Sequence, residues 1–150
     1  MSMHNSNDLS RRHIPLNGAS NFRDLGGYSG HQGRPVKWRK IFRSDHLAAL
    51  DHSDLNQLKT LGISRSFDFR GVQESQAQFY EWPNIQRYSL SIEPTVVQRL
   101  QAQHLTGKPL TATDALDAMQ TTYRDFVRSD SHRFSQLFEH LLDQPDPLLF

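Results

Sequence analysis

Helix-like and strand-like segments alternate along this chain, and that alternation restricts the folds it can adopt. Apolar residues recur every three or four positions in three segments, 54–61, 113–128 and 131–143, and this spacing predicts amphipathic helices. Strands are expected over 41–44, 63–69 and 85–92, and a fourth helix from Pro94 to about Leu105. Such an order predicts an α/β fold with a central, mostly parallel sheet flanked by helices.

Local signals mark the first helix and the strand that follows it. Asp51 or Ser53 can cap the N-terminus of the helix over 54–61, and Gly62 stands where a left-handed C-cap is expected. The next segment alternates apolar and polar side chains except at Arg65, which breaks the parity. We therefore expect helix, turn and strand in direct succession.

The final residues are an apolar run bounded by prolines. Pro145 and Pro147 stop the last helix, and Leu148-Leu149-Phe150 predicts the opening of a buried central strand. Ligands of open α/β sheets bind at the carboxyl ends of strands, so the loop expected to carry chemistry would follow this run. We expect residues 14–150 to be the N-terminal part of a single domain, interrupted within a central strand. Residues 1–13 are polar and predict a disordered tail.

Composition argues against several classes of function. Seventeen basic and sixteen acidic residues give a net charge of +1, which is too balanced to favour nucleic acid as a partner. No apolar run of 18 residues occurs, so no membrane span is predicted, and the polar N-terminus favours a cytoplasmic protein over a secreted one. The eight histidines lack metal-ligand spacing, and no metal or other cofactor is expected. Because the chain has no cysteine, thiol chemistry cannot arise from these residues.

An ordered series of short motifs narrows the fold further. It consists of Asn21-Phe22-Arg23-Asp24, Gly33-Arg34-Pro35, Phe42-Arg43-Ser44 and Asp68-Phe69-Arg70, followed by Glu74, Tyr123 and Leu148-Leu149-Phe150. This series resembles the bacterial and fungal tyrosine-phosphatase family, whose members act on phosphotyrosine, phosphoserine and, in some cases, phosphoinositides. The resemblance runs from about residue 13 to residue 150, which is nearly the whole chain.

In that family, the strand that resembles Leu148–Phe150 runs directly into His-Cys-x-x-Gly-Lys-Asp-Arg-Thr-Gly. This loop carries the cysteine nucleophile, a phosphate-binding arginine and an aspartate proposed as the proton donor. A cysteine at a helix N-terminus is a thiolate near neutral pH, and backbone N–H groups with a guanidinium hold the phosphate dianion. The resemblance implies a cysteine-phosphatase-like fold that lacks its catalytic-loop portion, with the nucleophile beyond residue 150. The 150-residue chain alone is then expected to be inactive.

The implied function is that of a protein-tyrosine phosphatase, acting through a cysteinyl-phosphate on a phosphorylated protein or a phosphoinositide. A second hypothesis is a catalytically inactive module that binds a phosphorylated ligand or serves as a scaffold. A third is a module that docks on lipid surfaces through a stretch of basic residues. Because these basic residues alternate with apolar ones, the stretch also fits the solvated face of a hairpin. Its cations are Arg34, Lys37, Arg39, Lys40 and Arg43.

Asp68 and Arg70 are candidate site residues because they end a predicted strand. They would line the phosphate pocket, with Asp68 orienting the loop arginine or relaying a proton, and a structural ion pair is the alternative. Glu74 could pair with Arg70 if a helix begins there. Three nearby aromatic residues could be core or the wall of a pocket for an aromatic leaving group: Phe79, Tyr80 and Trp82.

Arg23, Asp24 and Arg43 are candidates for substrate binding. Arg23 and Asp24 lie in a glycine-flanked turn, where they could contact the substrate or brace the catalytic loop. In the bracing role, Asp24 would accept hydrogen bonds from backbone or guanidinium donors. Arg43 follows a predicted strand and has the same two options.

Overall fold

The computed structural model describes residues 11–93, 95–105, 107, 109 and 111–150. Five strands form one sheet in the order β1-β2-β5-β3-β4. Their bounds are β1 Arg23–Asp24, β2 Ile41–Arg43, β3 Arg65–Asp68, β4 Gln86–Ser89 and β5 Leu148–Leu149. The helices are α2 His52–Thr60, α3 Val72–Ala77, α4 Thr95–Leu105, α5 Ala112–Arg128 and α6 Ser131–Asp143, with a short 3₁₀ helix, η1, over His31–Gly33.

β5 lies at the centre of this sheet. It pairs in parallel with β2, where Phe42 lies opposite Leu149, and with β3, where Arg65 lies opposite Leu148. β3 and β4 are also parallel, whereas β1 and β2 run antiparallel. Leu148 and Leu149 are completely buried, as expected of a strand covered on both faces. The predicted α/β fold, a mostly parallel sheet flanked by helices, is confirmed.

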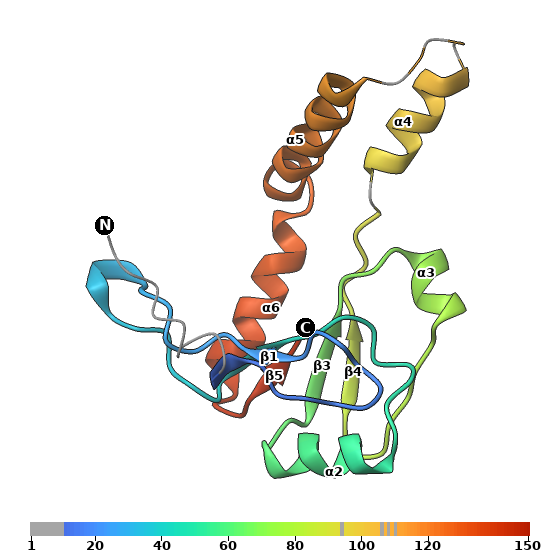
Figure 1. Ribbon diagram of the computed structural model, residues 1–150. Helices are drawn as coiled ribbons and strands as arrows, with labels where there is room; N and C mark the ends of the chain where they lie inside the picture. The colour runs from blue at the N-terminus through green and yellow to red at the C-terminus, as the bar shows by residue number, and fades with distance from the viewer. Residues whose placement is uncertain (1–10, 94, 106, 108, 110) are drawn as a thin grey trace.

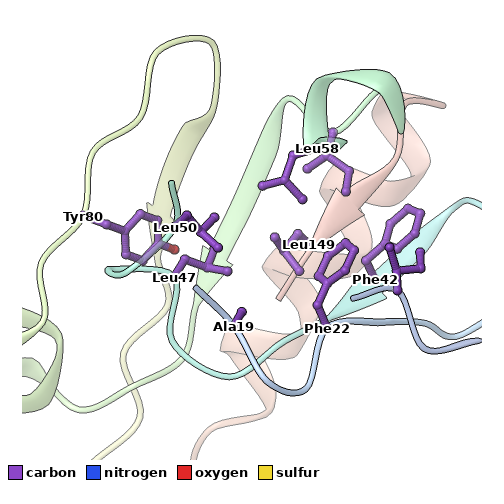
Figure 2. Packing of buried hydrophobic residues seen from close by; sticks show 10 residues of the cluster. Ala19, Phe22, Phe42, Leu47, Leu50, Leu58, Tyr80 and Leu149 are labelled. Carbon is purple, nitrogen blue, oxygen red and sulfur yellow. The ribbon is translucent and has the colours of Figure 1, made fainter. Parts of the chain in front are cut away.

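Two apolar clusters cover the two faces of the sheet, because successive residues of a strand point to opposite faces. Leu149 belongs to the cluster that includes α2, where the rings of Phe22 and Phe42 stack with centroids 5.5 Å apart (Figure 2). Leu148 belongs to the other cluster, together with Leu137 of α6. Helix α2 therefore packs on one face and α6 on the other, while α4 and α5 stand together beyond the sheet (Figure 1).

Helix α2 carries the cap signals expected at its two ends, although it covers His52–Thr60 rather than 54–61. The N-cap is Asp51, rather than Ser53, and its carboxylate accepts the N–H of Asp54 at 2.9 Å. The carboxylate of Asp54 accepts the N–H of Asp51 in return and also that of Asn17 at 2.8 Å, which ties the preceding loop to the helix. Gly62 has a φ of +74°, the left-handed conformation expected just after the helix.

Arg65, which interrupts the apolar pattern of β3, is buried because its guanidinium binds backbone carbonyls at and after the end of α6. It is 2% exposed, and its guanidinium donates to the carbonyls of His140 at 2.7 Å, Gln144 at 3.2 Å and Asp146 at 2.9 Å. The last carbonyls of a helix have no partner within it and carry partial negative charge. Arg65 therefore joins β3 to the C-terminal end of α6.

Several boundaries differ from those predicted. β3 and β4 are shorter than 63–69 and 85–92, since pairing with the neighbouring strand, rather than the apolar pattern, decides where a strand ends. Helix α4 begins at Thr95, and the predicted start at Pro94 lies outside the described residues. Of the expected tail, residues 11–13 contact the domain: Arg12 is 4% exposed and His13 bridges to β1. None of the helices in the described ranges is long and apolar enough to cross a membrane.

Candidate active site

A cavity of about 440 Å³ opens at the carboxyl ends of β2, β3 and β5. This is the edge of a parallel sheet at which α/β proteins bind ligands. Three predicted site residues line it: Arg43 at the end of β2, Asp68 at the end of β3 and Arg70 in the loop before α3. The remaining lining residues are Ser44, Asp45, His46, Leu47, Ser66, Phe67, Phe69, Glu74, Tyr80, Leu149 and Phe150.

Asp68 is the centre of a buried ionic network. Arg70 grips its carboxylate with two parallel hydrogen bonds, from Nε at 2.9 Å and from Nη2 at 2.8 Å. Arg87 of β4 donates a third from Nη2 at 2.8 Å, and the Ser75 hydroxyl donates a fourth at 3.0 Å. The carboxylate also accepts the backbone N–H of Arg70 at 3.0 Å. One carboxylate thus fixes two guanidinium groups beside the cavity.

The network keeps Asp68 ionised. Burial by itself would raise the pKa of this carboxyl group, but hydrogen bonds from Arg70 and Arg87 outweigh burial and hold the pKa well below its usual value. Hydrogen bonding to Asp68 in turn raises the pKa of Arg70. Because Asp68 carries no proton near neutral pH, its surroundings suit the orientation of an arginine better than the relay of a proton.

Arg70 retains one donor that the protein does not use. Among the described side chains, its Nη1 is buried and has no hydrogen-bond partner, although Nε and Nη2 are both engaged. Arg70 precedes α3, which begins at Val72, so it pairs with Asp68 instead of forming the helical pair predicted with Glu74. Arg70 lines the cavity, and a guanidinium at such a place is a group that can bind an anion.

The loop after β2 forms a second wall of the cavity. Asp45 accepts hydrogen bonds from the hydroxyl of Ser20 at 2.7 Å and from that of Ser44 at 3.1 Å. Burial opposes ionisation of Asp45, yet these hydrogen bonds lower its pKa overall. The buried Nδ1 of His46 has no partner among the described residues. Arg43 is exposed, with its guanidinium 6.0 Å from the ring centroid of Phe150.

Of the three aromatic candidates named from the sequence, Tyr80 lines this pocket. Its ring lies near two guanidinium groups, 5.0 Å from that of Arg87 and 5.9 Å from that of Arg70. Its hydroxyl bonds to Ser66 at 3.3 Å, and burial raises its pKa. Of the other two aromatic candidates, Phe79 is 57% exposed and Trp82 packs against the α2 cluster, and neither lines the cavity.

Two predicted site residues lie outside the cavity lining. Arg23 donates to the backbone and side-chain oxygens of Asn21 at 2.8 and 2.6 Å. Asp24 is 1% exposed and accepts the N–H groups of Gly26 at 2.8 Å and Arg39 at 2.9 Å. These contacts fix the glycine turn, and the roles expected of Arg23 and Asp24 toward the substrate or the catalytic loop stay predictions.

Sequence inspection missed Arg87. Arg87 lies on β4 opposite Ser66 of β3, and this register brings its guanidinium to Asp68, 19 positions away in the chain. A basic residue within a predicted strand was the available signal, but its partner depends on which strands pair. Among the described residues, no group of three or more histidine, aspartate and glutamate side chains is placed to hold a metal ion.

Comparison with known proteins places these features in a family. A family model described as "Tyrosine phosphatase family" matches residues 14–150. The chain is also 37% identical over 68 residues to the Cupriavidus necator protein named "Putative tyrosine-protein phosphatase". That match covers 45% of this chain and 25% of the relative, so the aligned part spans a quarter of the relative's length. Because the family model matches nearly the whole chain, this chain belongs to the tyrosine phosphatase family.

Proposed function

We propose that the cavity is the phosphate-binding part of a phosphatase active site, which removes phosphate from tyrosine side chains of a phosphorylated protein. The observation that carries this proposal is the guanidinium of Arg70, a cavity-lining residue that Asp68 holds in place through two hydrogen bonds. Its Nη1 has no hydrogen-bond partner among the described residues. A fixed guanidinium loses little rotational freedom when it binds an anion and is ready to stabilise charge in the transition state.

The proposed nucleophile is a cysteine that would follow residue 150, as the family resemblance implies. The strand pairing of β2 and β5 continues into Phe150, whose N–H donates to Phe42 at 3.0 Å and whose carbonyl accepts from Ser44 at 2.8 Å. Phe150 also lines the cavity, so residues attached to it would enter the space beside Arg70. A thiolate there attacks phosphorus, the bond to the tyrosine oxygen breaks, and a positioned acid protonates the departing phenolate. Water then hydrolyses the cysteinyl-phosphate.

Asp68 serves this reaction as a positioning residue. The hydrogen bonds that lower its pKa leave it without a proton to give near neutral pH. Its contribution is the orientation of Arg70, and through Arg70 the placement of the phosphate. Tyr80 supports the choice of an aromatic substrate, because its ring forms an apolar surface beside the two arginines. Phosphoserine and phosphoinositides are further candidate substrates, and the proposed location is cytoplasmic.

The proposal is tested with the 150-residue chain and with the same chain extended through the segment that follows Phe150. The 150-residue chain is expected not to hydrolyse p-nitrophenyl phosphate, and the extended chain is expected to do so. In the extended chain, Arg70→Gln should lower kcat/KM by about 100-fold, as the loss of a transition-state donor does elsewhere. The exposed Arg124→Gln is the matched control and should leave kcat/KM unchanged.

Three results would overturn this assignment: turnover by the cysteine-free 150-residue chain, unchanged activity of Arg70→Gln, or the absence of cysteine after Phe150. The last result would favour the second candidate, a catalytically inactive module that binds phosphorylated ligands. The free Nη1 donor of Arg70 in a chain without cysteine suits that candidate too. Phosphotyrosine binding without hydrolysis, lost in Arg70→Gln, would identify it.

A further inference from the structure

Charge is strongly segregated along this chain, although the whole is almost neutral. Residues 11–43 contain eight arginines and lysines and one acidic residue, a net charge of +7. The rest of the chain contains nine cations and fifteen acidic residues, a net charge of −6. The overall charge of +1 is therefore the sum of a strongly basic segment and a remainder with a net negative charge.

The structure concentrates this positive charge on one hairpin, residues 26–40, which we call the basic ribbon. The hairpin is held by backbone hydrogen bonds from Gly27 to Val36 at 2.9 Å and from Val36 to Tyr28 at 2.8 Å. It projects from the β1 edge of the sheet, at the left of Figure 1. Four exposed cations lie on it: Arg34, Lys37, Arg39 and Lys40.

Two further arginines from the start of the described chain join the basic ribbon. The guanidinium of Arg11 lies 5.1 Å from the ring centroid of Trp38, and that of Arg12 lies 3.8 Å from the ring centroid of Tyr28. Arg12 also donates to the carbonyl of Gly26 at 3.0 Å. These contacts join Arg11 and Arg12 to the basic ribbon, so that cations from two separate segments of the chain lie together.

The acidic residue of the segment does not cancel this charge at the surface. Asp24 is 1% exposed, and it accepts the backbone N–H groups of Gly26 and Arg39. Its ion pair with Arg39, at 3.8 Å, leaves that side chain 58% exposed. The surface of the basic ribbon is consequently cationic, whereas the carboxylate of Asp24 is buried.

We propose that the basic ribbon docks this protein on an anionic lipid surface. Cations on a projecting hairpin can approach a flat, negatively charged bilayer, and each cation near such a surface contributes attraction within a Debye length. Tyr28, which is 38% exposed, and the half-buried Trp38 place amphipathic rings among these cations, as at membrane interfaces. This pairing of cations with amphipathic rings favours a lipid headgroup region over a nucleic-acid duplex.

The test measures co-sedimentation of the 150-residue chain with vesicles. One set is phosphatidylcholine alone, and the other contains about 30% phosphatidylserine. Binding is expected to the anionic vesicles at about 0.1 M salt and to be lost at about 1 M salt, where the Debye length falls to about 3 Å. Replacing three exposed cations, in the variant Arg11→Gln, Arg34→Gln and Lys37→Gln, should lower the partition coefficient by about 100-fold.

The matched control removes the same number of charges elsewhere, in the variant Lys59→Gln, Arg124→Gln and Arg128→Gln, all exposed residues of α2 and α5. It should bind like the unsubstituted chain, and equal thermal unfolding of both variants shows that they fold. Equal loss of binding in the two variants, or equal binding to neutral and anionic vesicles, overturns the proposal. So does tighter binding to duplex DNA than to anionic vesicles at the same salt concentration, which would reassign the ribbon to nucleic acid.

Discussion

Replacing Asp68 by asparagine tests the buried network at the edge of the cavity. The substitution keeps the shape of the side chain, removes its charge, and turns one acceptor oxygen into an N–H₂ donor. That donor would face guanidinium groups of Arg70 and Arg87, which now approach the carboxylate at 2.8 Å. Two arginines would then lack their shared anion, in a site where the aspartate side chain is 3% exposed.

The loss of stability expected for Asp68→Asn follows from the burial of the three charged side chains. Removal of one partner from a buried ion pair destabilises a protein by about 3–5 kcal/mol, because the remaining charge is left without compensation. Arg70 and Arg87 are 16% and 18% exposed, so water can solvate them in part and the lower end of that range applies. We expect Asp68→Asn to lower the free energy of unfolding by about 3 kcal/mol, which corresponds to roughly 6–12 °C in Tm.

The effect has a defined pH dependence. The folded state lowers the pKa of Asp68, so its stabilising contribution is complete above the unfolded pKa of about 3.9 and is lost as pH falls through the folded pKa. The difference between the unsubstituted chain and Asp68→Asn should therefore be constant near neutral pH. It should shrink when the pH is lowered below about 4.

Urea denaturation followed by circular dichroism, at several pH values, measures both expectations. Asp117→Asn, at an exposed position on α5, is the matched control and should change stability by less than about 0.5 kcal/mol. A loss below about 1 kcal/mol for Asp68→Asn would refute the reasoning, since that is the size of a solvent-screened surface pair. A pH-independent loss would show that shape, rather than charge, matters at this position.

Two further substitutions examine the scaffold. Arg65→Met should lower the free energy of unfolding by about 3 kcal/mol, because the carbonyl of His140 in α6 and those of Gln144 and Asp146 just after it lose a charged donor. Urea denaturation measures this loss, with the exposed Lys59→Met as the control. A loss no larger than the control would contradict the helix-capping role. Gly62→Ala should cost about 1 kcal/mol in thermal unfolding, since a φ of +74° strains any residue with a Cβ; an unchanged Tm would show that the turn relaxes.

The architecture followed largely from local patterns in the sequence. The spacing of apolar residues predicted helices α2, α5 and α6, and the aspartate and glycine at the two ends of α2 were visible as cap signals. The proline-bounded run at the end of the chain indicated the central strand β5. The same logic put Asp68 and Arg70 at a strand end beside the cavity, because ligands of parallel sheets bind at that edge.

The ion pair of Asp68 with Arg70 was one of the two options open from the sequence, but the partners of the other buried arginines were decided by the tertiary structure. Arg87 reaches Asp68 only through the register of β3 and β4, Arg65 needs the end of α6 above it, and Arg12 needs the ring of Tyr28. Apolar periodicity can be read locally, because the repeat of a helix or strand fixes which of its side chains share a face. Ion pairs between distant segments depend on which segments the fold brings together. That proximity in space cannot be read from the positions of the residues along the chain.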